Sequence, residues 1–181
     1  NGEDVTCNGV CDGSADVTIS GGVPSFTYVW SPAPGGGQGT DNVTGLCAGT
    51  IYTITVTDGN GCIASDAVTL TAPPVLSAAI TASTEPSCNG VCDGNATVTA
   101  SGGTGAYTYS WFPAGGTGAT STSVFCDATL YIVTVTDANG CSTTANITLG
   151  EPLVLTVVIA GTDASCNGGS DGAASTTVAG G

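Results

Sequence analysis

Residues 51–71 of the chain read IYTITVTDGNGCIASDAVTLT. Apolar and polar side chains alternate on both sides of the DGNG segment, residues 58–61, which is typical of two half-buried β-strands joined by a turn. The Asn-Gly pair favours a two-residue type I′ turn, in which both central residues have positive φ. This stretch therefore predicts a β-hairpin with strands at Ile51–Asp58 and Ile63–Thr71.

The features of this hairpin recur about 79 residues later. TVTDGNGC at residues 55–62 is matched by TVTDANGC at residues 134–141. Upstream, CNGVCDG at residues 7–13 returns at 88–94, and a third version, CNGGSDG, occupies 166–172. Several motifs thus repeat in the same order, which indicates tandem modules.

Proline-bearing segments separate the modules, which we place at residues 1–73, 74–151 and 152–181. The middle module is complete, the first lacks its first strand, and the third holds only the start of a module. Further strands are expected at Asp16–Ser20 and Phe26–Trp30, with equivalents in the second module. About seven short strands in each module of about 79 residues predict an all-β chain of tandem Ig-like β-sandwiches.

Two interpretations account for the incomplete outer modules. In the first, the chain is cut from a longer tandem array. In the second, it is a pilin-like subunit that polymerises by strand exchange, with residues near 153–163 completing the first module of another copy. The first is favoured, because residues 166–181 duplicate what residues 7–22 already supply.

The composition excludes many classes of function. The 181 residues include 14 acidic residues and no Lys, Arg or His, which gives a formal net charge of −14. Nucleic acids and anionic membranes need cationic side chains, and histidine-based catalysis is impossible. A paired-carboxylate hydrolase remains possible, but nothing singles out two carboxylates. We therefore expect no enzyme, and no membrane insertion, since no apolar run reaches the ~18 residues of a span.

Nine cysteines follow the repeat, four in each of the first two modules and one in the third. Zinc is disfavoured by the spacing and by the absence of His, so we expect disulfides and an extracellular location. Four cysteines allow three pairings. Ser170 replaces the cysteine found at positions 11 and 92, which argues against pairing within the CNGVC motif. The favoured nested pairs are Cys7–Cys62, Cys11–Cys47, Cys88–Cys141 and Cys92–Cys126, with Cys166 unpaired.

Aromatic residues alternate along one strand of each module and share one strand face. The functional interpretation is a platform on which a polysaccharide stacks. The alternative, which we favour, is that these side chains fill the sandwich core. The residues concerned are Tyr28, Trp30, Tyr109 and Trp111.

Carboxylates gather near the expected turns. They are weak candidates for Ca²⁺ ligands, since Ca²⁺ takes oxygen ligands. Asp side chains also bond the backbone of their own turns, and we favour that role. No cofactor is otherwise expected. The candidates are Asp12, Asp58, Asp93 and Asp137.

The CNG-x₂-DG opening, the Gly-Gly turn, the Tyr-x-Trp strand, the Tyr-x₃-Val-Thr-Asp strand and the closing Asn-Gly-Cys together resemble the SprB repeat family. The resemblance implies tandem Ig-like modules in surface adhesins of Bacteroidota, exported by type IX secretion and active in gliding motility. It implies neighbouring repeats or other copies as partners, and Cys7–Cys62 as the basic disulfide. It carries over no catalytic or ligand-binding residue.

Overall fold

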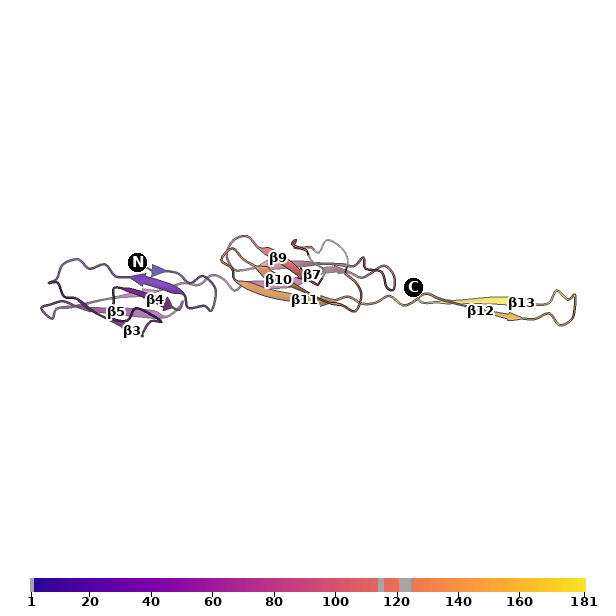
Figure 1. The fold of residues 1–181 in the computed structure, drawn as a ribbon, viewed down its shortest axis with the longest axis horizontal. Coiled ribbons are helices and arrows are strands. Elements are labelled where there is room, and N and C mark those ends of the chain that lie inside the picture. Colours follow the sequence, from indigo (N-terminus) through magenta and orange to yellow (C-terminus); the bar gives the residue numbers. More distant parts are fainter. Residues whose placement is uncertain (1, 114–115, 121–124) are drawn as a thin grey trace. The chain divides into compact units, whose positions relative to one another are not determined.

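Residues 2–113, 116–120 and 125–181 are described by a computed structural model, shown in Figure 1. The described residues form strands, turns and loops, with no helix among them, so the all-β prediction is confirmed. They group into two compact units. The first comprises Asn1–Ser77, Ala100–Tyr107 and Thr136–Thr143, and the second comprises Ala78–Thr99, Thr108–Val135 and Thr144–Gly181.

The first unit contains two three-stranded sheets, with orders β1-β2-β4 and β3-β5-β6. Inward-facing side chains from both sheets, including Trp30, Val43, Leu46 and Ile54, form one buried core. This is the packing of a β-sandwich. The strands are β1 (Gly2–Glu3), β2 (Gly13–Asp16), β3 (Thr27–Ser31), β4 (Asn42–Leu46), β5 (Ile51–Thr57) and β6 (Ile63–Thr69).

The predicted hairpin is present as β5 and β6, which pair from Ile51↔Thr69 to Thr57↔Ile63. Its turn differs from the expected type I′ form. Gly61 has a φ of 83°, whereas Asn60 is not among the described residues with positive φ. The Asp58 carboxylate accepts the Asn60 N–H at 2.9 Å, and Gly61 alone of the pair takes the left-handed conformation.

The second repeat builds the same sandwich, with Phe125 in the place of Leu46. Phe125 stacks on Tyr131 at 3.7 Å between ring centroids and meets Trp111 edge-on at 5.3 Å. All three are buried, and such pairs stabilise a core beyond the area that they bury. The strands are β7 (Ser77–Thr84), β8 (Asn95–Ser101), β9 (Thr108–Phe112), β10 (Leu130–Thr136) and β11 (Ser142–Thr148), in sheets β7-β8 and β11-β10-β9.

The strand expected at Asp16–Ser20 is shorter than predicted, since β2 ends at Asp16. The corresponding strand of the second repeat, β8, runs on to Ser101 because it pairs with the eight-residue β7. In the first repeat β1 is only two residues long. A strand needs a partner for its backbone groups, so residues 17–20 do not continue the ladder.

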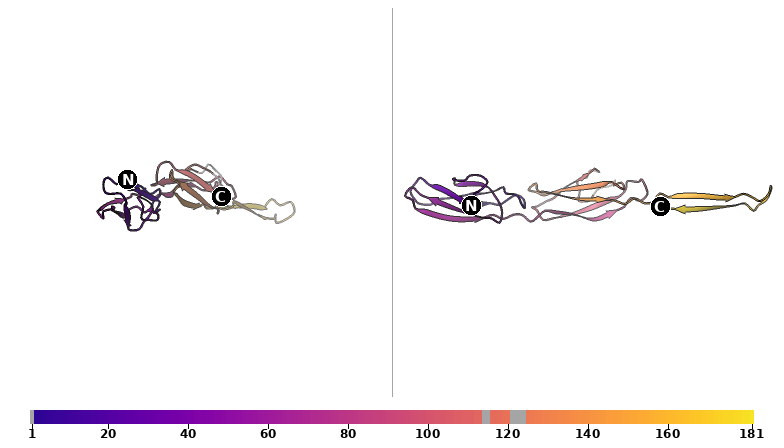
Figure 2. Two further views of the ribbon diagram at one scale, coloured as in Figure 1. Left: turned by 60° about the vertical axis from the view of Figure 1, so that its left-hand side comes forward. Right: turned by 90° about the horizontal axis from the view of Figure 1, so that it is seen from below.

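The last two strands, β12 (Thr156–Thr162) and β13 (Ala173–Ala179), form a hairpin that Figure 2 shows from two further sides. Seven residue pairs join them, from Thr156↔Ala179 to Thr162↔Ala173. Every residue of both strands is exposed. The segment proposed for strand exchange thus pairs with its own chain, which argues against that interpretation.

Candidate functional site

The first half of the site is the loop that carries the CNGVCDG motif. Asp12 folds back over it, and its carboxylate accepts the N–H of Thr6 at 2.9 Å and the Thr6 hydroxyl. These two bonds hold the pKa of Asp12 below its ordinary value, because they favour the ionised form. The loop therefore presents Cys7 from a closed turn. We call residues 6–13 the loop half of the site.

The second half is the turn that closes the TVTDANGC motif. The Asp137 carboxylate accepts the N–H groups of Thr104, Asn139 and Cys141 at 2.8, 3.0 and 2.9 Å. Desolvation raises the pKa of Asp137, but these bonds lower it by more, so the net pKa lies below its ordinary value. A buried carboxylate thus stays ionised because backbone donors surround it. We call residues 137–141 the turn half.

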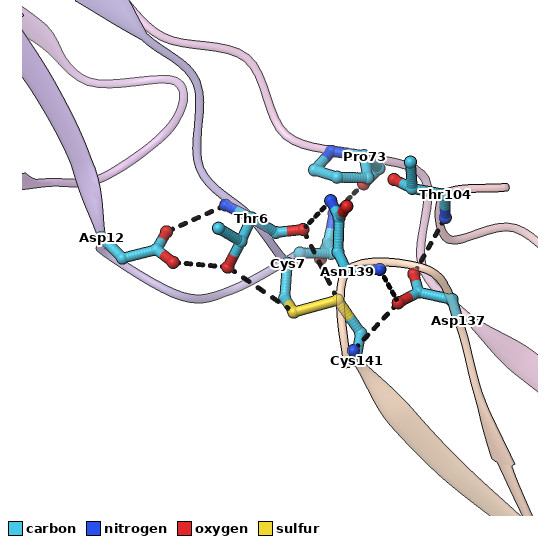
Figure 3. The surroundings of a disulfide bond; sticks show 9 residues. Thr6, Cys7, Asp12, Pro73, Thr104, Asp137, Asn139 and Cys141 are labelled. Atoms are coloured by element: carbon cyan, nitrogen blue, oxygen red, sulfur yellow. Dashed lines mark hydrogen bonds between the residues drawn. A yellow bond between two sulfur atoms is a disulfide. The ribbon is translucent and has the colours of Figure 1, made fainter.

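A disulfide between Cys7 and Cys141 joins the two halves, as Figure 3 shows. Their Cα atoms are 5.8 Å apart, a usual separation for a disulfide. The side-chain amide of Asn139 donates to the carbonyl of Thr6 at 2.9 Å and adds a second contact beside the sulfur atoms. The bond joins residues 134 positions apart and connects the first repeat to the second.

The proline linker passes beside this disulfide. Asn8 donates its side-chain N–H to the carbonyl of Pro73 at 3.0 Å, and Gly103 donates its backbone N–H to Pro74 at 2.9 Å. Both linker carbonyls are thus bonded, one to the loop half and one to the second repeat. The junction is held by a covalent cross-link and by hydrogen bonds on each side of the linker.

The expected pair Cys7–Cys62 is wrong, because strand β6 separates these cysteines. Cys7 lies beyond the end of β6, where Val5 and Asp4 bond the backbone of Thr71 at 3.4 and 2.7 Å. Cys62 precedes the start of β6. Seven extended residues span roughly 20 Å, far beyond the Cα separation of a disulfide.

The expected pair Cys88–Cys141 is wrong for the same reason. Asn89 donates to the carboxylate of Glu151 and to the carbonyl of Pro152, beyond β11, whereas Cys141 precedes that strand. Each of these cysteines therefore lies at the opposite end of its repeat from the expected partner.

The structure does bring together the inner cysteines of each repeat. Cys11 bonds Cys47, and Cys92 bonds Cys126. The first disulfide joins the loop before β2 to the segment after β4, and the second joins the loop before β8 to the segment before β10. Beside them, the hydroxyls of Tyr52 and Tyr131 accept the N–H groups of Cys47 and Cys126 at 3.1 and 2.7 Å. Cys62, Cys88 and Cys166 are free and exposed.

The tryptophans are core residues and do not form a stacking platform. Trp30 is 4% exposed and Trp111 is 2% exposed, so neither ring can receive a sugar. Their indole N–H groups donate to the carbonyls of Thr40 and Gly118 at 3.1 and 3.0 Å. Tyr28 and Tyr109, on the same strands, are half-buried. The polysaccharide interpretation loses its two central residues.

The acidic candidates do not converge on a metal site in the described parts of the chain. No group of three or more Cys, Asp or Glu side chains is close enough there to hold an ion. Each carboxylate instead accepts backbone N–H groups of its own turn, and Asp58 and Asp137 also accept one from the loop after the Gly-Gly pair. Asp58 repeats the bonds of Asp137, and Asp93 accepts the N–H of Ser87 at 2.8 Å, as Asp12 does from Thr6. The pKa values of Asp58 and Asp93 are lowered by these donors.

One hollow of about 660 Å³ lies in the first repeat, along residues 17–20. Apolar side chains of the sandwich, including Val17, Ile54 and Val56, line it. In the second repeat β7 pairs along the corresponding residues of β8. The hollow thus has the place and the lining of a strand position, and the Asp58 carboxylate that reaches it is engaged by backbone donors.

The cross-repeat pairing of Cys7 was missed because the periodic sequence carries no signal for it. Cys141 is the equivalent of Cys62 in the next repeat. The cysteines therefore recur at the same positions of the repeat whether Cys7 bonds within its own repeat or bonds the next one. Asn139 was missed for a different reason. Its Asn-Gly step predicts a turn, and nothing in that pattern says that the side chain bonds another repeat.

These features define a class: tandem β-sandwich repeats that are cross-linked by disulfides and whose repeated motifs build turns and junctions. The SprB repeat family model matches residues 1–35 and 80–116, which is the family that the motifs resemble. SprB repeats are structural repeats that occur in cell-surface proteins. No curated protein matches the chain. Within the described residues, no helix is both long enough and apolar enough to cross a membrane.

Proposed function

We propose that the chain is a segment of an extracellular filament or surface adhesin, in which tandem Ig-like repeats provide reach and hold an adhesive region away from the cell. The observation that carries this proposal is the Cys7–Cys141 disulfide, which ties one repeat to the next. Such a link gives a stalk resistance to separation of its modules. Export by type IX secretion and a part in gliding motility belong to the same proposal.

The chemistry of the surface supports a stalk more than a ligand-binding module. Trp30 and Trp111, the two central candidates for stacking on a sugar, are buried, and the carboxylates of the turns are bonded to backbone N–H groups. Neighbouring repeats of the array are the partners that we propose. The uniform absence of Lys and Arg leaves a negative charge on every repeat, which disfavours clumping of parallel filaments at low salt.

Immunogold labelling of intact cells that produce the protein tests the proposal. Antibodies against the chain are expected to decorate filaments outside the cell, and protease treatment of intact cells is expected to remove the label. Antibodies against a cytoplasmic protein serve as the control for lysis. Label found only inside intact cells would contradict the proposal.

A further inference from the structure

The two halves of the Cys7–Cys141 site recur in this chain where the cysteines are free. Cys62 lies in a turn, residues 58–62, that is equivalent to the turn half of the site. Its N–H bonds the Asp58 carboxylate at 2.8 Å, and the N–H of Asn60 bonds the same oxygen at 2.9 Å. The matching distances at Cys141 and Asn139 are 2.9 and 3.0 Å. The thiol of Cys62 is exposed on this preformed turn.

Cys88 and Cys166 each lie in a loop that is equivalent to the loop half of the site, at residues 87–94 and 165–172. Asp93 accepts the N–H of Ser87 at 2.8 Å, and Asp171 accepts that of Ser165 at 3.0 Å, as Asp12 does from Thr6. Both thiols are exposed. The three free cysteines therefore divide into one turn half and two loop halves, and each has the local fold of a cysteine that is bonded elsewhere in the same structure.

The linker beside Cys88 is also folded as it is beside Cys7. Asn89 donates to the carbonyl of Pro152 at 3.1 Å, which matches the 3.0 Å bond from Asn8 to Pro73. Gly181 then donates to Leu153 at 3.0 Å, in the manner of Gly103 to Pro74. The start of the third repeat is thus hydrogen-bonded beside Cys88 in the same way as the start of the second repeat is beside Cys7.

We propose that Cys88 and Cys166 are binding sites for the Asn-Gly-Cys turn of the repeat that follows each of them, and that Cys62 receives the loop cysteine of a preceding repeat. This inference rests on the proposed function as an array. Every repeat is then cross-linked to the next by one disulfide equivalent to Cys7–Cys141. The partner is a turn with the sequence Asp-x-Asn-Gly-Cys from another SprB-type repeat of the same chain.

The bond forms by thiol–disulfide exchange with a small disulfide such as oxidised glutathione. The thiolate of the loop cysteine attacks one glutathione sulfur and expels glutathione thiolate. The thiolate of the turn cysteine then attacks the protein sulfur of the mixed disulfide and expels the second glutathione. The two cysteines together lose two electrons and two protons, and oxidised glutathione becomes two molecules of glutathione.

A chain with one added repeat tests this inference. A second copy of residues 73–151 is inserted between Glu151 and Pro152, so that a complete repeat follows Cys88. The protein is refolded in glutathione redox buffer, its remaining thiols are titrated under denaturing conditions, and its disulfides are mapped by mass spectrometry. We expect a new bond between Cys88 and the inserted copy of Cys141, with the thiol count unchanged at the three of the original chain.

Other outcomes overturn the proposal. A bond between cysteines 88 and 141 of the same repeat would be seen in the disulfide map and would overturn the proposal, whatever the thiol count. Failure of the new turn to react would leave more than three thiols. Disulfide-linked multimers whose yield rises with protein concentration would show that the partner is another chain.

A matched variant guards against a folding defect. In the insertion chain carrying Cys88→Ser, the inserted Cys141 copy is expected to stay reduced while the Cys92–Cys126 bond still forms. Bonding of the inserted cysteine to any other site in this variant would contradict the assignment. Because these readouts use purified protein, they are independent of the labelling experiment that tests location on the cell surface.

Discussion

Two glycines with the same sequence neighbours have different surroundings. Gly21 and Gly102 each begin a Gly-Gly pair after serine, and their φ angles are 84° and 75°. A Cβ at Gly21 meets nothing within 4 Å, whereas a Cβ at Gly102 lies 1.9 Å from the carbonyl oxygen of Val75. Both positions favour glycine because the backbone is left-handed there. Only at Gly102 is there also no room for a Cβ atom.

Replacing each of these glycines by alanine separates the two effects. Gly21→Ala is expected to destabilise by about 1 kcal/mol, from the positive φ alone. Gly102→Ala is expected to cost at least about 2 kcal/mol, because the chain around Val75 must shift as well. Urea unfolding of both variants measures the difference. Equal losses of unfolding free energy in the two variants would mean that the backbone at Val75 shifts without cost.

The Asp137 carboxylate makes a pH-dependent contribution to stability. Its pKa is lowered in the folded state, so the unfolded chain binds more protons in acid, and the contribution is full above the unfolded pKa of about 3.9. Asp137→Asn is expected to destabilise at pH 7, and its deficit relative to the original chain is expected to shrink as the pH falls below about 4. Denaturant titrations between pH 2 and 7 measure this.

Exposed Asp163 provides the matched control, since Asp163→Asn removes the same charge outside any turn half. We expect little change in the free energy of unfolding at any pH for this variant. A deficit of Asp137→Asn that stays constant across the pH range would contradict the role of its ionised form.

At the scale of elements, the sequence predicts what depends on local pattern. The hairpin of β5 and β6, the core position of Trp30 and the turn role of Asp58 all follow from alternation and from the preferences of Asn, Asp and Gly. The length of β2 does not, because it depends on whether a neighbouring strand is present. The disulfide partner of Cys7 does not follow from local pattern either, because it depends on which end of a strand lies next to the following repeat.

The inner disulfide is expected to stabilise the first repeat strongly. Cys11 and Cys47 close a loop with a sequence separation of 36, for which the chain-entropy model gives about 4 kcal/mol. Cys11→Ser with Cys47→Ser is expected to lower the stability of that repeat by up to this amount. Thermal unfolding under oxidising conditions measures it.

Cys62→Ser is the control for that measurement, since Cys62 is exposed and unbonded in this chain. Its effect is expected to stay within about 0.5 kcal/mol, as for most surface substitutions. A large loss for Cys62→Ser would show that this thiol is engaged within the chain and would contradict its assignment as free.

At the scale of the whole molecule, charge has one sign only. No Lys, Arg or His offsets the 14 carboxylates. No salt bridge between side chains can form, so disulfides, apolar cores and turn hydrogen bonds carry the stability. Composition alone predicts this property, because it holds for every arrangement of the same residues.

Loss of that charge is expected to make the chain associate. At pH 7 and low salt, repulsion keeps molecules apart, and the net charge vanishes only near about pH 3, where almost all of the carboxyl groups are protonated, because no side-chain cation balances them. Light scattering during an acid titration is expected to rise near this pH and to fall when the pH returns to 7. Scattering that is already high at pH 7, or that does not rise near about pH 3, would contradict this prediction.

The Cys7–Cys141 bond also determines how the chain carries tension. A pull between the two ends passes from Cys7 directly to Cys141 through the sulfur atoms and leaves the 134-residue interval between them slack. Even with every strand unravelled, the disulfide withholds roughly 450 Å of the contour length that a reduced chain would release, at about 3.4 Å per residue. Repeats joined in this way lengthen far less under load than reduced repeats, and the withheld length is released only when the sulfur–sulfur bond is broken.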